Sequence, residues 1–383
     1  MDFDFTEEQR LLRDSVDRLL ADRYTFDKRK AYLAEPDGWS RAQWAQYAEL
    51  GLLGLPFPEA HGGFGGGGIE IMLVMEAFGR TLVLEPYLAT AVLAGTALRL
   101  AGSEAQQAAL VPQIAEGNLL LAFAHGERQA RYDLPDVPTA AKQKGRGWVI
   151  DGSKSVVSHG DSAGRLIVSA RTAGSRNDTD GITLFLVDGD ANGVARRAYT
   201  MRDGTRAAEI TLSGVEVGGD AVLGQVGAAY PVIERVVETG IAATAAEAVG
   251  CMETMQAMTL EYLKTRQQFG QPIGRNQALQ HRATEMFVSL EQGRSLAMLA
   301  AMMVDEPDSG VVGAAERARN LSIVKAGVGQ AARFVSQNAV QLHGGIGMTE
   351  EYAVGHYFRR CMVIEHTFGD TAHHLSRLAQ QVT

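Results

Sequence analysis

The first 118 residues repeat their apolar positions every three or four residues, which is the spacing of amphipathic helices. In the first such segment these positions are Leu11, Leu12, Val16, Leu19 and Leu20. Thr6 and Gln9, just before them, have the spacing of a capping box. Residues 56–68 contain too many glycines and prolines for a helix or a strand. We therefore predict a helical N-terminal domain over residues 1–118, interrupted by one glycine-rich loop.

The pattern changes twice more along the chain. Residues 119–225 contain short runs rich in Val, Ile and Leu, separated by Gly, Asp and Asn, which predicts an antiparallel sheet or barrel. The helical period returns from about residue 230, in a predicted C-terminal domain of residues 226–383, with long segments at 241–265, 277–304 and 312–340. Because helices and strands do not alternate, the pattern argues against a Rossmann sheet. It predicts an α+β fold of a helical domain, a central β-domain and a C-terminal helical domain.

Composition narrows the classes of partner. A formal net charge of -9 and a pI near 5.5 argue against a nucleic-acid partner, which needs a concentrated positive surface. The acidic start and the lack of about 18 uninterrupted apolar residues predict a cytoplasmic protein that does not insert into membranes. Cys251 and Cys361 are predicted to be buried thiols. His373 and His374 are predicted to lie on a helix surface, so no metal site is expected.

The segment 265–281, Thr-Arg-Gln-Gln-Phe-Gly-Gln-Pro-Ile-Gly-Arg-Asn-Gln-Ala-Leu-Gln-His, places an arginine between a helix and a Gly/Pro turn. Such an arginine can bind a phosphate through two parallel hydrogen bonds, and the first N–H groups of the next helix offer an anion site. Taken alone, this arrangement is more often a helical hairpin with a surface salt bridge.

The residue string itself closely resembles the acyl-CoA dehydrogenases, whose signature is T-R-x-Q-F-G-x-P-I-G-x-x-Q-x-x-x-H. The resemblance continues through the stretches 5–10, 50–63, 205–218 and 341–352, and so covers nearly the whole chain. It implies the three domains predicted above, with a four-helix bundle at the C-terminus. It also implies a dimer of dimers, an acyl-CoA substrate, an electron-transfer flavoprotein or similar acceptor, and FAD extended at a subunit interface.

The resemblance maps cofactor contacts onto nine positions: Ser158, Arg266, Gln268, Phe269, Gln277, Gln341, Gly344, Gly345 and Asp370. Arg266 would neutralise the diphosphate of an FAD held by a neighbouring subunit. Gly344 and Gly345 would let the main chain approach the cofactor without a Cβ clash. Ser158 would form a hydrogen bond near flavin N5, in a strand where Val156 stands at a position commonly held by tryptophan. The alternative for the glycines is a simple helix-terminating turn.

The glutamate that acts as the family's base is missing. Removing the α-proton of an acyl-CoA calls for a carboxylate within hydrogen-bond reach. The usual position maps onto Phe368, and the position used by some relatives maps onto Gly240. Glu247 lies two helical turns beyond Gly240, on roughly the same face, and is the candidate base, with a structural ion pair as the alternative. Glu365 and Asp370 would need a shifted turn to reach the substrate.

The expected function is FAD-dependent α,β-dehydrogenation of an acyl-CoA thioester, with hydride transfer to flavin N5. The protein would act as a homotetramer, or as the smaller subunit of a heterotetramer whose partner supplies the base. The ending over residues 368–374 resembles the small-subunit type associated with pimeloyl-CoA dehydrogenases. Two alternatives stay open, namely a catalytically silent subunit at an FAD interface and a flavin monooxygenase on the same fold.

Overall fold

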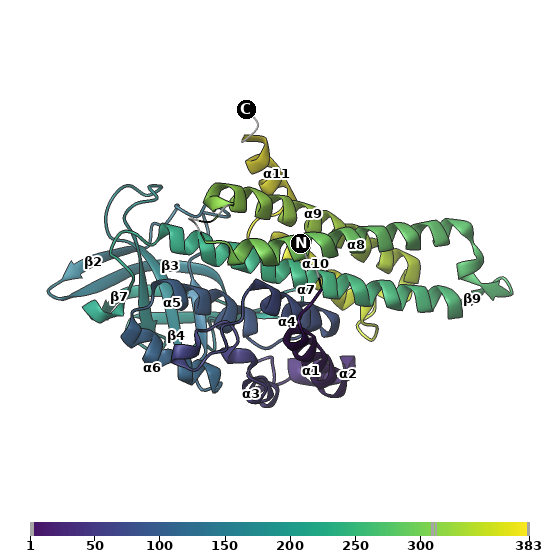
Figure 1. Ribbon diagram of the computed structural model, residues 1–383, viewed down its shortest axis with the longest axis horizontal. Helices are drawn as coiled ribbons and strands as arrows, with labels where there is room; N and C mark the ends of the chain where they lie inside the picture. The colour runs from purple at the N-terminus through teal and green to yellow at the C-terminus, as the bar shows by residue number, and fades with distance from the viewer. Residues whose placement is uncertain (1–3, 308–309, 311, 381–383) are drawn as a thin grey trace. The chain divides into compact units, whose positions relative to one another are not determined.

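The computed structural model describes residues 4–307, 310 and 312–380 of the chain (Figure 1). Contacts divide the chain into two compact units. The helical unit consists of the described residues of Met1–Ala31, Gly67–Val83 and Ile241–Thr383. The sheet unit consists of Tyr32–Gly66 and Leu84–Gly240. The predicted order of helices, then strands, then long helices is confirmed, and so is the α+β class, while the three domain boundaries stay a prediction.

The N-terminal region is helical as predicted. Its helices are α1 (Glu7–Arg23), α2 (Phe26–Leu33), α3 (Arg41–Glu49), α4 (Gly68–Thr81), a π-helix (Leu88–Ala94), α5 (Gly95–Ala101) and α6 (Glu104–Ala115). Thr6 and Gln9 form the predicted capping box, because the Thr6 hydroxyl accepts from the Gln9 amide and the Gln9 side chain accepts from the Thr6 amide. The glycine-rich loop is also present. A Cβ at Gly63 would lie 2.1 Å from the Phe57 carbonyl oxygen, so this position excludes larger residues.

The strands of the sheet unit form an eight-stranded, largely antiparallel sheet in the order β6-β7-β3-β2-β4-β5-β8, with β1 parallel to β4. They are β1 (Leu121–Ala124), β2 (Ala140–Lys144), β3 (Gly147–Ser158), β4 (Arg165–Arg171), β5 (Ile182–Asp188), β6 (Val194–Thr200), β7 (Arg206–Val217) and β8 (Val222–Leu223). Alternate residues of these strands fill one core, which includes Ile150, Leu166, Phe185 and Ile210.

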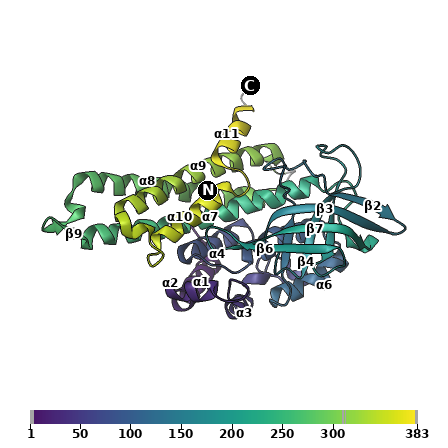
Figure 2. The ribbon, with the colours of Figure 1, turned by 180° about the vertical axis from the view of Figure 1, so that it is seen from behind.

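The C-terminal helices are α7 (Tyr230–Thr265), α8 (Gln277–Asp305), α9 (Gly313–His343), α10 (Val354–His366) and α11 (Thr371–Gln380). Helices α8 and α9 run side by side, and a small hairpin of β9 (Gln267–Gln268) and β10 (Gln271–Pro272) projects from the end of α7 (Figures 1 and 2). Within the described part of the chain, no helix combines the length and apolar character needed to cross a membrane.

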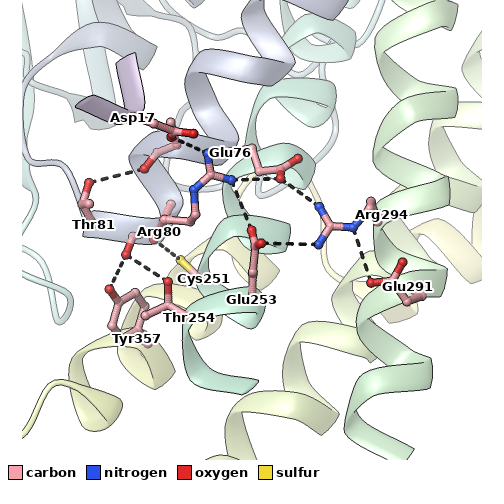
Figure 3. A network of polar contacts seen from close by, with 12 residues as sticks. Asp17, Glu76, Arg80, Thr81, Cys251, Glu253, Thr254, Glu291, Arg294 and Tyr357 are labelled. Atoms are coloured by element: carbon pink, nitrogen blue, oxygen red, sulfur yellow. Dashed lines mark hydrogen bonds and ion pairs between the residues drawn. The ribbon is translucent and has the colours of Figure 1, made fainter. Parts of the chain in front are cut away.

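Within the helical unit, a network of charges links α1, α4, α7 and α8 (Figure 3). The Arg80 guanidinium contacts Asp17 at 2.6 Å, Glu76 at 3.0 Å and Glu253 at 3.2 Å. Arg294 contacts Glu76 at 2.9 Å from the other side. Burial raises the pKa of Glu76, an effect that the two guanidinium groups only partly reverse. The network therefore holds a largely buried carboxylate that depends on its cations.

Replacing Arg80 with methionine is expected to lower the free energy of unfolding by about 2 kcal/mol. The variant leaves Asp17, Glu76 and Glu253 with one cation fewer, and the estimate is reduced because Arg80 is partly exposed. Urea denaturation followed by circular dichroism measures the change. Arg13→Met is the control, because its ion pair with Asp14 is solvent-exposed. Equal losses for the two variants would contradict a structural role for the network.

Candidate functional site

Strand β3 carries a bulge next to one of the predicted cofactor contacts. Two of its residues, Ser155 and Val156, lie opposite a single residue of β7, Glu209. Val156 has a φ of +53°, a left-handed conformation that β-branched residues rarely adopt, and is 57% exposed. Ser158 follows at the end of the strand and is half-buried. The bulge therefore presents an apolar side chain close in sequence to a partly accessible hydroxyl.

A buried lysine anchors β3 directly before this bulge. Lys154 is fully buried, and its ammonium donates to Glu127 Oε1 at 2.7 Å, Ser169 Oγ at 3.0 Å and the His125 carbonyl oxygen at 3.2 Å. Glu127 Oε1 also accepts from the Thr139 amide at 3.1 Å. Sequence reasoning assigned no role to Glu127 or His125, although Lys154 occupies an inward strand position, which signals a buried cation in need of a carboxylate.

The pKa shifts of Lys154 and His125 indicate that this buried cluster has a structural role. Burial lowers the pKa of Lys154 to about 8, and Glu127 works in the opposite direction. Burial, followed by the neighbouring Lys154 charge, lowers the pKa of His125 to about 3. His125 is therefore a neutral imidazole at neutral pH, and its Nδ1 forms a hydrogen bond with Ser169 Oγ at 2.9 Å. It does not provide an acid at neutral pH.

Four predicted cofactor contacts lie together on the segment between α7 and α8. Arg266 directly follows α7, Gln268 lies on β9 and Gln277 begins α8, and all three are exposed. Phe269 and Gly270 form the hairpin turn with φ values of +51° and +78°. Phe269 is 100% exposed. A phenylalanine that is both fully exposed and left-handed is uncommon, and it points to a surface that contacts a ligand or another chain.

Three further predicted contacts lie at the end of α9. Gln341 is in its last turn, and Gly344 and Gly345 follow His343 at the surface. The His343 ring lies 4.6 Å from the Tyr262 ring, which brings the end of α9 beside the last turn of α7. Gly344 has a φ of +67°, and a Cβ built at either glycine meets no atom within 4 Å. The turn is therefore open to an approaching group.

The turn between α10 and α11 contains Phe368, the position onto which the sequence resemblance maps the base. Phe368, at φ +60°, is half-buried, and Gly369 follows at φ +102°. Asp370 caps α11, because its Oδ1 accepts from the His373 amide at 2.8 Å, and this hydrogen bond lowers the pKa of Asp370. The prediction that His374 lies on the helix surface is wrong. Its ring is buried, and its Nε2 forms a hydrogen bond with the Phe368 carbonyl oxygen at 2.9 Å. The turn before α11 therefore folds back against the helix and covers this side chain.

Glu365, the other carboxylate near this turn, is buried and held from three sides. Its Oε1 accepts from Arg333 at 3.1 Å and from the Thr371 amide at 3.1 Å. Its main-chain oxygen accepts from the Lys325 ammonium at 2.9 Å. Glu365 thus fixes the ends of α10 and α11 to α9.

Glu247, the candidate base, is engaged in a buried ion pair. Its two carboxylate oxygens accept from Nε and Nη2 of Arg360 on α10, each at 2.6 Å. Glu247 is only 3% exposed. A carboxylate bound through both oxygens to a guanidinium must break strong hydrogen bonds before it can take a proton. This geometry favours the structural alternative that the sequence left open.

Each unit, taken by itself, has accessible residues that suit part of a large anionic cofactor with an aromatic ring system. Arg266 offers a planar cation for a diphosphate, and Phe269 offers an exposed ring. Gly344 and Gly345 offer main chain without a covering side chain. The residues of the sheet unit, Val156 and Ser158, offer an apolar contact and a hydroxyl. Within the described residues there is no cluster of side chains suited to a metal ion.

Comparison with known families covers almost all of the chain. Three family models match it, namely acyl-CoA dehydrogenase N-terminal domain at residues 6–118, middle domain at residues 122–215 and C-terminal domain at residues 230–383. Among curated proteins, the acyl-CoA dehydrogenase FadE12 of Mycobacterium tuberculosis is 30% identical over 357 residues. That alignment covers 91% of this chain and 89% of the relative.

Solved structures give the same result. The ChsE4-ChsE5 complex from Mycobacterium tuberculosis matches with a TM-score of 0.89 and 26% identity, over 100% of this chain and 99% of that one. A variant of the Tcur3481-Tcur3483 steroid ACAD matches with a TM-score of 0.86 and 28% identity, over 98% of each chain. Each of these two structures is named for two components.

Proposed function

This chain belongs to the acyl-CoA dehydrogenase family, and on that premise we propose that it is an FAD-dependent acyl-CoA dehydrogenase acting as one subunit of a heteromeric enzyme. The reaction removes a proton from the α-carbon and a hydride from the β-carbon of an acyl-CoA thioester. FAD supplies the hydride acceptor when bound. An electron-transfer flavoprotein or a similar acceptor would then remove the electrons.

The proposed cofactor contacts are the exposed residues described above. Arg266 binds the diphosphate of an FAD held by the neighbouring subunit, and Phe269 covers part of that cofactor. Gly344 and Gly345 bring main chain against it. Ser158 donates its hydroxyl near flavin N5. The exposure of Arg266, Phe269 and both glycines supports these assignments, because no part of the described chain covers them.

The main support for a heteromeric enzyme is the presence of phenylalanine at position 368. A phenylalanine stands where the family places its base, and a phenyl ring cannot accept a proton. The candidates elsewhere are occupied, since Glu247 binds Arg360 and Asp370 caps α11. A partner subunit with its own glutamate would complete the chemistry. The two-component descriptions of the similar structures support such a partner. The same observations favour a second candidate, a catalytically silent subunit that only completes the FAD interface.

Anaerobic titration of the purified, FAD-loaded chain with straight-chain, branched and ring-bearing acyl-CoAs tests the proposal. We expect the chain alone to bind FAD and to leave the flavin absorbance unchanged, because Phe368 replaces the base and Glu247 is held by Arg360. Phe368→Glu is expected to produce acyl-CoA-dependent bleaching by restoring a carboxylate. Bleaching by the unmodified chain would show that it carries its own base. Failure of the correctly assembled protein to take up FAD would reject the flavoenzyme assignment. A Phe368→Glu variant that binds FAD and acyl-CoA without bleaching would favour the silent subunit.

A further inference from the structure

The bulge of β3 holds Val156 in a conformation that has to be maintained by its surroundings. A left-handed backbone conformation is strained for a β-branched residue, and such strain persists only where neighbouring groups fix the backbone. Strain of this kind concentrates at ligand clamps and active sites. Val156 is also exposed, so packing on its own side chain does not fix it. The restraint must come from the backbone and side chains beside it.

Glu209 provides that restraint. It lies on β7 directly opposite the bulge. Its Oε2 accepts from Ser155 Oγ at 2.8 Å, and its Oε1 accepts from the Val156 amide at 3.3 Å. The Tyr199 hydroxyl, from β6 on the other side of β7, donates to the same Oε1 at 3.0 Å. One carboxylate therefore binds both residues of the bulge and is itself held by a third group.

The pKa shifts of Glu209 and Tyr199 agree with these hydrogen bonds. Burial raises the pKa of Glu209, but the hydrogen bonds from Ser155, Tyr199 and the Val156 amide outweigh burial and lower it overall. Burial and the bond to Glu209 raise the pKa of Tyr199 to about 12. Glu209 is thus an anion that only accepts, and Tyr199 is a neutral donor. Lys154, buried on the opposite side of β3, fixes the residue before the bulge.

We propose that Glu209 is a positioning residue for the cofactor, holding the strained bulge of β3 so that Val156 and Ser158 meet the flavin. The inference rests on the proposed function, since it requires FAD to lie against β3. Glu209 touches neither cofactor nor substrate and acts through Ser155 and Val156. Tyr199 sets the orientation of the Glu209 carboxylate.

Glu209→Gln tests the assignment with little change in volume. The amide removes the negative charge and replaces one acceptor oxygen by a donor, so Ser155 must accept where it now donates, and the remaining hydrogen bonds lose their charge assistance. We expect FAD binding to weaken about tenfold, and the visible absorbance spectrum of the bound flavin to shift at saturating FAD. Glu216→Gln is the matched control, because Glu216 lies on the same strand in an exposed pair with Lys144 at 2.6 Å. The control is expected to keep the unmodified affinity and spectrum.

Two milder variants keep the test decisive if Glu209→Gln does not fold. Ser155→Ala and Tyr199→Phe each remove one donor, and each is expected to weaken FAD binding by about threefold with a smaller spectral shift in the same direction. Unchanged affinity and spectrum in both would overturn the proposal, as would a folded Glu209→Gln that behaves like the unmodified protein. These outcomes differ from failure of the proposed function, in which the unmodified chain itself takes up no FAD.

Discussion

Replacing Lys154 with methionine is expected to lower the free energy of unfolding of the sheet unit by about 4 kcal/mol. The substitution leaves Glu127 buried without its cation, and breaking a buried pair from one side is far more damaging than losing an exposed pair. It also removes the ammonium's hydrogen bonds to Ser169 Oγ and to the His125 carbonyl oxygen. Chemical denaturation followed by near-ultraviolet circular dichroism measures the change.

Two further variants separate the buried charge from other effects. Lys144→Met removes a lysine from the neighbouring strand β2, where it forms an exposed pair with Glu216, and is expected to change stability by less than about 1 kcal/mol. Combining Lys154→Met with Glu127→Gln removes both buried charges and is expected to recover part of the loss. A Lys154 variant no less stable than the Lys144 variant would show that the buried pair contributes little.

The helices and the glycine-rich loop could be predicted from the sequence because their signals are local. The capping box of Thr6 and Gln9 joins residues three positions apart, and helical periodicity is visible within one segment. The start of the longest helix was harder to predict. Helix α7 begins at Tyr230, where the helical period is predicted to return, but the long segment itself is predicted to start only at residue 241.

Partners of buried charges could not be predicted, because tertiary structure selects them. Glu247 binds Arg360, 113 residues away, and Lys154 binds Glu127, 27 residues away. Both carboxylates can be identified in the sequence, but the residues around them do not indicate which cation each one binds. The bulge illustrates the same limit. Glu209 occupies an ordinary strand position, and its role arises only because the register places two residues of β3 against it.

The proposed cofactor contacts depend on exposure rather than on internal bonding, so their test is binding rather than stability. Arg266 and Phe269 lie on the exposed hairpin segment and were named from the residue string of that segment. The structure adds that Phe269 adopts a left-handed backbone conformation and is fully exposed. Such a residue contributes little to the stability of its own chain. Its substitution should therefore affect assembly and cofactor uptake first.

Replacing Arg266 with alanine is expected to weaken FAD binding roughly a hundredfold, equivalent to about 2.8 kcal/mol, because two charge-assisted hydrogen bonds to the diphosphate are lost together. Arg266→Lys keeps the charge but lacks the planar guanidinium. Its FAD affinity is expected to lie between those of the unmodified chain and Arg266→Ala. Fluorescence titration of the apoprotein with FAD gives the affinities. The Arg266→Ala variant should also show a weaker dependence on salt, since one ionic contact is gone.

Arg275→Ala is the matched control, because Arg275 is exposed in the same segment between α7 and α8 and is not among the proposed contacts. It is expected to bind FAD as the unmodified chain does. Unfolding midpoints of both variants should stay close to that of the unmodified chain, since both side chains are exposed. If Arg266→Ala and Arg275→Ala weaken FAD binding equally, the segment contributes only general positive charge. If neither has an effect, the diphosphate lies elsewhere and the proposed contacts of this hairpin are wrong.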